Sequence, residues 1–154
     1  MDIPASDLAD SGCKQFFQYK WGAVSNMESL LIIDDDEQIR LLLKELLLNE
    51  GYTVFEAEDG DKGMSLCRMQ EIQLVIIDVF MPKKDGLETI RELHDAFPSI
   101  KTLAMSGGYF ADSIDVLHMA KKFGATQVLE KPFALEKFLE TVKDILSESS
   151  IADH

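Results

Sequence analysis

Residues 30–36 read LLIIDDD, an apolar run of strand length that passes directly into three carboxylates. Residues 74–78, LVIID, end in the same way. Runs that are apolar at every position are typical of central strands covered on both faces of a parallel sheet. The two stretches therefore predict a buried parallel sheet with acidic residues at the carboxyl ends of its central strands.

Strand-length apolar runs alternate with stretches of helical period five times from Glu28 onward. The predicted strands are Leu30–Ile33, Thr53–Ala57, Leu74–Ile77, Ile100–Met105 and Gln127–Leu129. Four predicted helices carry an apolar stripe. The stripes consist of Ile39, Leu42, Leu43, Leu46 and Leu47; of Leu87, Ile90, Leu93 and Phe97; of Ile114, Leu117, Ala120 and Phe123; and of residues from Leu135 to Leu146. A fifth predicted helix, with a less sharp pattern, covers about 61–69. Short connections between strands and helices predict an α/β fold, a doubly wound five-stranded parallel sheet with helices on both faces.

The chain has 154 residues, which predicts one domain. We assign residues 27–147 to it. Residues 1–26 lack a sustained period and form a predicted extension, either a stretch upstream of a true start at Met27 or a short docking segment that uses its aromatic residues. Residues 148–154 form a predicted tail, too short for an attached output domain.

The composition excludes several functional classes. Against 28 Asp and Glu stand 15 Lys and Arg, a net charge of −13, so direct binding to nucleic acid or to an anionic membrane is not expected. Cys13 and Cys67 are too few and too far apart for a disulfide framework or a zinc site, and no apolar stretch reaches the length of a membrane span. We therefore expect a cytoplasmic protein without membrane insertion.

Polar side chains follow four of the predicted strands. Asp34 and Asp35 follow the first strand, Asp78 the third, Ser106 the fourth and Lys131 the fifth. In such a sheet the ligand site lies beyond the carboxyl ends of the strands, so we expect these five side chains to converge on one rim.

The acidic residues have a structural explanation and a functional one. An acid at a helix start can cap the helix, and we assign this role to Asp36. Capping does not explain Asp34 and Asp35 beside Asp78, because like charges about 4 Å apart repel by roughly 4 kcal/mol at an effective dielectric constant of 20. A cation relieves this repulsion. Oxygen ligands without a nearby His or Cys suit Mg²⁺.

Lys131 and Ser106 add the remaining chemistry. A strand-end lysine is ordinarily solvated, and Ser106 could cap the helix that follows it. Opposite a carboxylate cluster, however, Lys131 can hold Asp78 ionised, and Pro132 permits a cis peptide that aims the lysine inward. A hydroxyl before Gly107 and Gly108 is a donor on a loop. Together these side chains indicate a carboxylate nucleophile, Asp78, surrounded by the groups that phosphoryl transfer needs.

At this point the sequence resembles the receiver domain of two-component response regulators. The matching motifs are IIDDD at 32–36, DVFMPKKDG at 78–86, MSG at 105–107 and KPF at 131–133, and together they cover about 29–147. The resemblance implies the flavodoxin-like order 2-1-3-4-5 that is also found in the chemotaxis receiver. It further implies a phosphorelay in which a sensor histidine kinase or a histidine phosphotransfer protein donates phosphate and a downstream target protein reads it.

The resemblance also assigns roles to residues. Asp78 would accept the phosphoryl group, and Asp35, Asp78 and the backbone carbonyl of Phe80 would ligate Mg²⁺, with Asp34 acting through water. Ser106 and Lys131 would bind the phosphoryl oxygens. The chain would catalyse only its own phosphorylation and dephosphorylation.

One position departs from the family pattern. Three residues before the lysine, where the family usually has an aromatic ring that swings inward on activation, this chain has Val128. The phosphorylation chemistry does not need that ring. The readout would then depend on loop movement or on Phe133 and its neighbours.

Other classes fit less well. A haloacid-dehalogenase-type phosphatase would use Asp34 of an Asp-x-Asp motif as its nucleophile, but Glu37-Gln38 departs from that motif and residues 78–82 would have no role. A flavodoxin-like cofactor carrier would need a phosphate loop rich in Ser, Thr and Gly. A degenerate receiver would lack some of the site residues, all of which are present.

Overall fold

The structure, a computed structural model, describes residues 28–81, 86–107 and 113–152. The predicted extension at 1–26 lies outside the described residues, as does the end of the predicted tail at 153–154.

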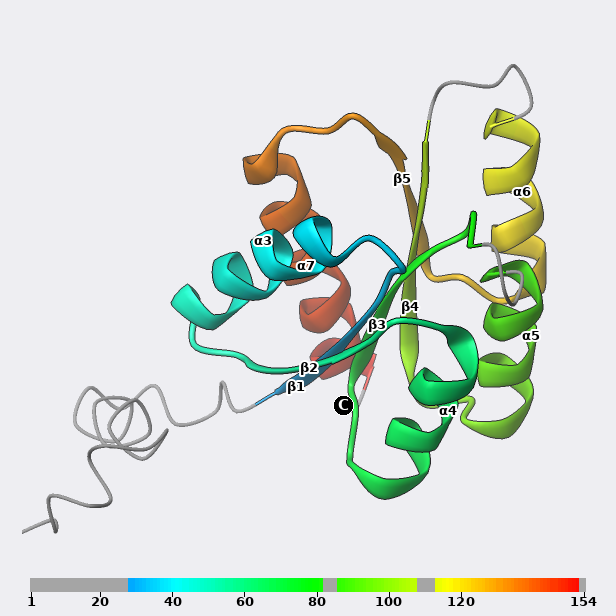
Figure 1. Cartoon of the computed structure of the whole chain (residues 1–154). Coiled ribbons are helices and arrows are strands. Elements are labelled where there is room, and N and C mark those ends of the chain that lie inside the picture. The colour runs from blue at the N-terminus through cyan, green and yellow to red at the C-terminus, as the bar shows by residue number, and fades with distance from the viewer. Residues whose placement is uncertain (1–27, 82–85, 108–112, 153–154) are drawn as a thin grey trace, which may run out of the picture.

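The fold is built on a five-stranded parallel sheet (Figure 1). The strands are β1 (Ser29–Ile33), β2 (Thr53–Ala57), β3 (Leu74–Asp78), β4 (Lys101–Gly107) and β5 (Gln127–Lys131). Their order is β2-β1-β3-β4-β5, which confirms the predicted topology. The apolar residues of β1 and β3 are all 0% exposed from position 30 to 33 and from 74 to 77, as central strands covered on both faces should be.

Among the described residues, five helices cover the two faces of the sheet. They are α3 (Glu37–Asn49), α4 (Gly60–Met69), α5 (Gly86–Ala96), α6 (Ser113–Phe123) and α7 (Leu135–Ala152). Helices α3 and α7 bury their apolar residues against one face, whereas α4, α5 and α6 cover the other (Figure 1). The two hydrophobic clusters lie on opposite faces of the sheet and pack against the strands that end at this rim.

Local sequence signals place the ends of α3, the helix that follows the acidic run. Asp36 is the N-cap, as predicted, and its side chain accepts hydrogen bonds from the backbone N–H groups of Gln38 and Ile39. After the helix, Gly51 has a φ of 97°, a left-handed conformation that side chains resist. The helix therefore starts directly behind the carboxylates of residues 34 and 35.

Several strand ends differ from the predictions by one or two residues, and three differences each affect a single predicted feature. Strand β4 continues to Gly107, so Ser106 lies inside the strand and neither caps a helix nor sits on a loop. Leu42, predicted to share the buried stripe of its helix, is 46% exposed. Helix α7 continues to Ala152, past the predicted boundary at residue 147.

No helix among the described residues is long and apolar enough to cross a membrane.

Candidate functional site

The strand register brings the predicted site residues to one rim. Ile33 of β1 pairs with Ile77 of β3, so Asp34 and Asp78, the next residue on each strand, lie side by side. Asp78 pairs with Met105 of β4, the residue before Ser106. Lys131 ends β5. The predicted convergence is therefore present.

Three carboxylates form the centre of the site. Asp34, Asp35 and Asp78 each offer an oxygen, and these oxygens lie within 4.8 Å of one another. Asp34 is 0% exposed and Asp78 is 7% exposed, while Asp35 faces solvent. Two buried carboxylates and one exposed carboxylate form an oxygen-only donor set open on one side, which fits a hard cation such as Mg²⁺ that keeps some of its waters.

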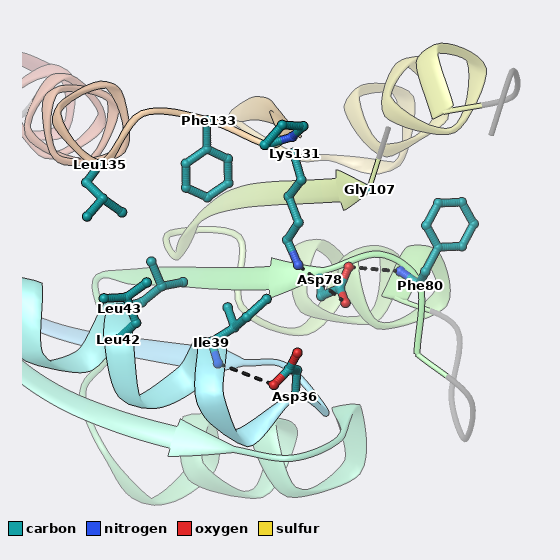
Figure 2. A pocket seen from close by; sticks show the side chains of 11 residues that line it. Asp36, Ile39, Leu42, Leu43, Asp78, Phe80, Gly107, Lys131, Phe133 and Leu135 are labelled. Carbon is teal, nitrogen blue, oxygen red and sulfur yellow. Dashed lines mark hydrogen bonds and ion pairs between the residues drawn. The ribbon is translucent and has the colours of Figure 1, made fainter. Parts of the chain in front are cut away.

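Lys131 supplies a cation opposite this cluster. Its Nζ lies 3.4 Å from Asp34 Oδ2 and 3.8 Å from Asp78 Oδ2. The peptide between Lys131 and Pro132 is cis. Figure 2 shows the lysine side chain extending toward Asp78. One ammonium group therefore faces two buried carboxylates.

Burial dominates the electrostatics of the two buried acids. It raises the pKa of Asp78 from 3.8 to about 6, with Lys131 lowering the pKa and Asp34 raising it. Burial also raises the pKa of Asp34, against a hydrogen bond from the backbone N–H of Asp36 and the charge of Lys131. Lys131 thus compensates only part of the cost of two buried charges, and the site retains a deficit of positive charge.

Ser106 carries an unpartnered hydroxyl. The residue is 0% exposed, and its Oγ has no hydrogen-bond partner among the described residues. A buried hydroxyl without a partner is uncommon and calls for an explanation such as an unseen ligand. A phosphoryl oxygen on the neighbouring strand end would supply the acceptor.

Backbone contacts hold the end of β3 in place. The Phe80 N–H donates to Asp78 Oδ1 at 3.2 Å, and the Val79 N–H donates to the Met105 carbonyl at 2.8 Å. Helix α5 begins so close beneath this segment that a Cβ on Gly86 would lie 2.6 Å from the Asp78 carbonyl oxygen. Gly86 is therefore needed for close approach, a role that its place in the quoted motif did not by itself reveal.

A cavity of about 560 Å³ opens beside the acids (Figure 2). Asp78 and Lys131 line one end of it. The other lining residues are Asp36, Ile39, Leu42, Leu43, Phe80, Gly107, Pro132, Phe133 and Leu135. The cavity explains why Leu42 is exposed, because its side chain lines the cavity and does not pack in the core. The cavity gives an incoming group access to Asp78 along an apolar wall.

Sequence reasoning missed Arg40. Its Nη1 donates to the backbone carbonyl of Asp34 at 2.6 Å, and its Nε donates to Glu56 Oε1 at 3.1 Å. The sequence did contain one indication that Arg40 has a special role. It is a basic residue close to the start of a helix, where the helix dipole disfavours positive charge.

The comparisons with known proteins agree on one family. Residues 30–143 match a family described as "Response regulator receiver domain". Among curated proteins, the transcriptional regulatory protein CpxR of Klebsiella pneumoniae is 32% identical over 123 residues, which cover 80% of this chain and 51% of that protein. The response regulator MprA of a Mycobacterium species is 33% identical over 121 residues, covering 79% of this chain and 51% of MprA. The chain thus spans about half the length of these curated relatives.

A solved structure shows the same fold. A CheY-like response regulator receiver domain protein from Methanospirillum hungatei superposes with a TM-score of 0.76 at 27% identity, covering 82% of this chain and 98% of that one.

Proposed function

Because the chain belongs to the family of response regulator receiver domains, we propose that it is phosphorylated on Asp78 by a phosphohistidine donor. The observation that carries this proposal is the juxtaposition of Asp78, a buried carboxylate at a strand end, with Lys131 and with the unpartnered hydroxyl of Ser106. The buried carboxylate and the unpartnered buried hydroxyl are each costly where they stand. A phosphoryl group on Asp78 gives all three a function.

The transfer is a substitution at phosphorus. One carboxylate oxygen of Asp78 attacks, the new O–P bond forms as the N–P bond of the phosphohistidine breaks, and the electron pair of that bond stays on the imidazole nitrogen. The carboxylate must be ionised to attack. Since its pKa is raised to about 6, most of it is ionised at neutral pH, and it is more basic than an ordinary aspartate.

Asp34, Asp35 and Asp78, with the carbonyl of Phe80, are the residues that would hold Mg²⁺. When bound, the ion neutralises charge on the carboxylates and on the transferring phosphoryl oxygens. Asp34 already accepts a hydrogen bond from the Asp36 N–H and faces Lys131, which suits it to an indirect role through water. Asp35 is exposed and can turn toward the ion.

Lys131 and Ser106 would receive the new charge. Phosphorylation adds about −1.5 to −2 charges at Asp78. The Lys131 ammonium can move from the two carboxylates to the phosphoryl oxygens, and Ser106 can donate its hydroxyl proton to one of them. This differential interaction favours the conformation of the β4 end that brings Ser106 closer.

The readout has to work without an inward-swinging ring at position 128. Val128 lies in β5 and is partly buried against the α4, α5 and α6 side of the sheet. Phe133 stacks on the fully buried Phe138, with ring centroids 5.8 Å apart. We assign the response to the end of β4, where Ser106 lies.

We further propose the partners and setting. A sensor histidine kinase or a histidine phosphotransfer protein donates the phosphoryl group, reaching Asp78 through the cavity, and a downstream protein recognises the phosphorylated form. The net charge of −13 argues against direct contact of this domain with nucleic acid. A cytoplasmic location fits these partners, and residues 27–147 are the unit that carries the function.

Labelling by acetyl phosphate in Mg²⁺ tests the assignment. Wild type should become labelled stoichiometrically on the peptide that contains Asp78. Asp78→Asn should fold and take no label, and excess EDTA should stop labelling of wild type. Asp144→Asn, a change at an exposed carboxylate on α7, is the matched control and should label normally.

Two results would contradict the proposal. Normal labelling of Asp78→Asn would exclude Asp78 as the acceptor. Label on Asp34 together with rapid turnover of small phosphate esters would instead indicate a haloacid-dehalogenase-type phosphatase.

A further inference from the structure

Arg40 donates a side-chain hydrogen bond to the peptide that joins the two acids after β1. Its Nη1 donates to the Asp34 carbonyl oxygen at 2.6 Å. That carbonyl belongs to the peptide bond between Asp34 and Asp35, so its orientation sets the directions in which both side chains leave the backbone. The Asp34 N–H on the other side of the residue donates to the Ala57 carbonyl at 3.2 Å. Asp34 is therefore held at both of its backbone polar groups.

A second contact fixes the guanidinium itself. Arg40 Nε donates to Glu56 Oε1 at 3.1 Å, and the other oxygen of Glu56 contacts Lys44 Nζ at 2.9 Å. The Arg40 side chain is 13% exposed. Hydrogen bonding from Lys44, with a further contribution from Arg40, lowers the pKa of Glu56, which keeps this acceptor ionised. The rigid fork of the guanidinium thus joins β2 to the acidic segment.

Helix stability does not explain this arginine. It is the fourth residue of α3, near the positive end of the helix dipole, where a cation is unfavourable. Its contacts reach backward to the segment before the helix and sideways to β2. The benefit of Arg40 therefore lies in the segment that carries Asp34 and Asp35.

We infer that Arg40 is a positioning residue that sets the geometry of the acidic cluster for Mg²⁺. This inference rests on the proposed function, since it concerns the metal of that site. Arg40 does not touch the metal ligand atoms in the structure; it acts through the backbone of Asp34. Groups that orient metal ligands in this way typically change metal affinity by about 10- to 100-fold when they are removed.

The sign of the effect separates positioning from simple electrostatics. Removing a positive charge near a cation site should tighten cation binding if Coulomb interactions alone matter. Loss of positioning should weaken it. Arg40→Met keeps much of the aliphatic stem and removes both the charge and the donors. We expect its dissociation constant for Mg²⁺ to rise about tenfold, the low end of the range for orienting groups.

Calorimetric titration of the whole chain with Mg²⁺ alone, at fixed pH and ionic strength, measures this constant. Lys44→Met is the matched control, because it breaks the other ion pair to Glu56 and leaves the bond from Arg40 to the Asp34 carbonyl. Its dissociation constant should stay within about twofold of wild type, since this half-buried ion pair does not contact the acidic segment and its loss leaves the bond from Arg40 to the Asp34 carbonyl in place. Arg40→Lys keeps the charge but loses the fork, so it should bind Mg²⁺ as weakly as Arg40→Met.

The outcomes separate this inference from the proposed function. Unchanged or tighter Mg²⁺ binding by Arg40→Met overturns the positioning role alone, and so does equal weakening by Lys44→Met. If Arg40→Met does not fold, Arg40→Lys decides: weaker binding supports the role and wild-type affinity overturns it. A wild type that binds no Mg²⁺ overturns the metal part of the proposed function and this inference with it.

Discussion

Asp78→Asn should make the protein more stable in the absence of metal. The wild-type Asp78 residue is 7% exposed and lies beside Asp34, and one lysine is shared between the two acids. A buried charge that is incompletely paired costs free energy, and Asn removes the charge while keeping the shape. The proposed phosphoacceptor is thus held at the expense of stability, as expected of a residue that serves function.

The magnitude follows from the pKa of Asp78. A change of one pH unit in a pKa corresponds to about 1.4 kcal/mol. Raising the pKa from 3.8 to about 6 therefore corresponds to about 3 kcal/mol at neutral pH, as an order of magnitude. This net shift already includes the contact from Lys131, at 3.8 Å, which lowers the pKa. We expect a gain of about 3 kcal/mol, or about 6 to 12 °C in Tm for a chain of this size.

The gain should depend on pH. The folded chain keeps the Asp78 proton up to about pH 6, whereas the unfolded chain releases it near the ordinary value of 3.8. Between these values the folded state binds more protons, so the contribution of Asp78 to wild-type stability falls as pH rises through this window. The advantage of Asp78→Asn should therefore be about 3 kcal/mol near pH 8 and about 1.5 kcal/mol near pH 5.

Urea unfolding in EDTA at the two pH values measures this difference. Asp144→Asn serves as the control, and a change at such an exposed site should stay within about 0.5 kcal/mol of wild type. A variant no more stable than wild type near pH 8 would refute the reasoning. An advantage of the same size at both pH values would show that the gain does not come from the ionisation of Asp78.

Two further predictions concern the metal and the hydroxyl. Mg²⁺ at ten times its dissociation constant should stabilise wild type by about 1.4 kcal/mol. Thermal unfolding should show that Asp35→Asn loses most of this stabilisation. An undiminished stabilisation of the variant would exclude Asp35 as a ligand. Ser106→Ala removes a buried hydroxyl that has no partner, so unfolding should show a stability unchanged or up to about 1 kcal/mol higher. Its labelling by acetyl phosphate should nevertheless be slower than wild type, and unimpaired labelling would contradict the role of Ser106.

Much of the fold could be predicted because its signals are local. The apolar runs of β1 and β3 indicated buried central strands, and all eight core positions that were quoted from them are fully buried. Asp36 was predicted as a cap, and it accepts the two backbone hydrogen bonds expected of one. The ends of parallel strands meet at one edge, so the convergence of Asp34, Asp35, Asp78 and Lys131 could also be predicted.

Other features depend on contacts between distant segments. Ser106 was predicted on a loop, but pairing of β4 with β5 extends the strand through Gly107 and buries the hydroxyl. Leu42 has the spacing of a core residue, yet the packing of α3 beside the segment that follows β5 leaves it lining a cavity. Helix period alone does not distinguish a core from the wall of a cavity.

The sequence by itself determined the alternation of strands and helices, the identity of the acids and lysine, and the rim on which they meet, because each depends on neighbours in the chain or on parallel strand direction. Only the tertiary structure decided how deeply each of these groups is buried and which charges lie beside it. Burial, not residue type, raises the pKa of Asp78, and the position of Lys131 between two carboxylates limits the compensation. Arg40 contacts both the Asp34 carbonyl and Glu56 only when α3, the end of β1 and β2 are in place together, because Glu56 lies 16 residues further along the chain.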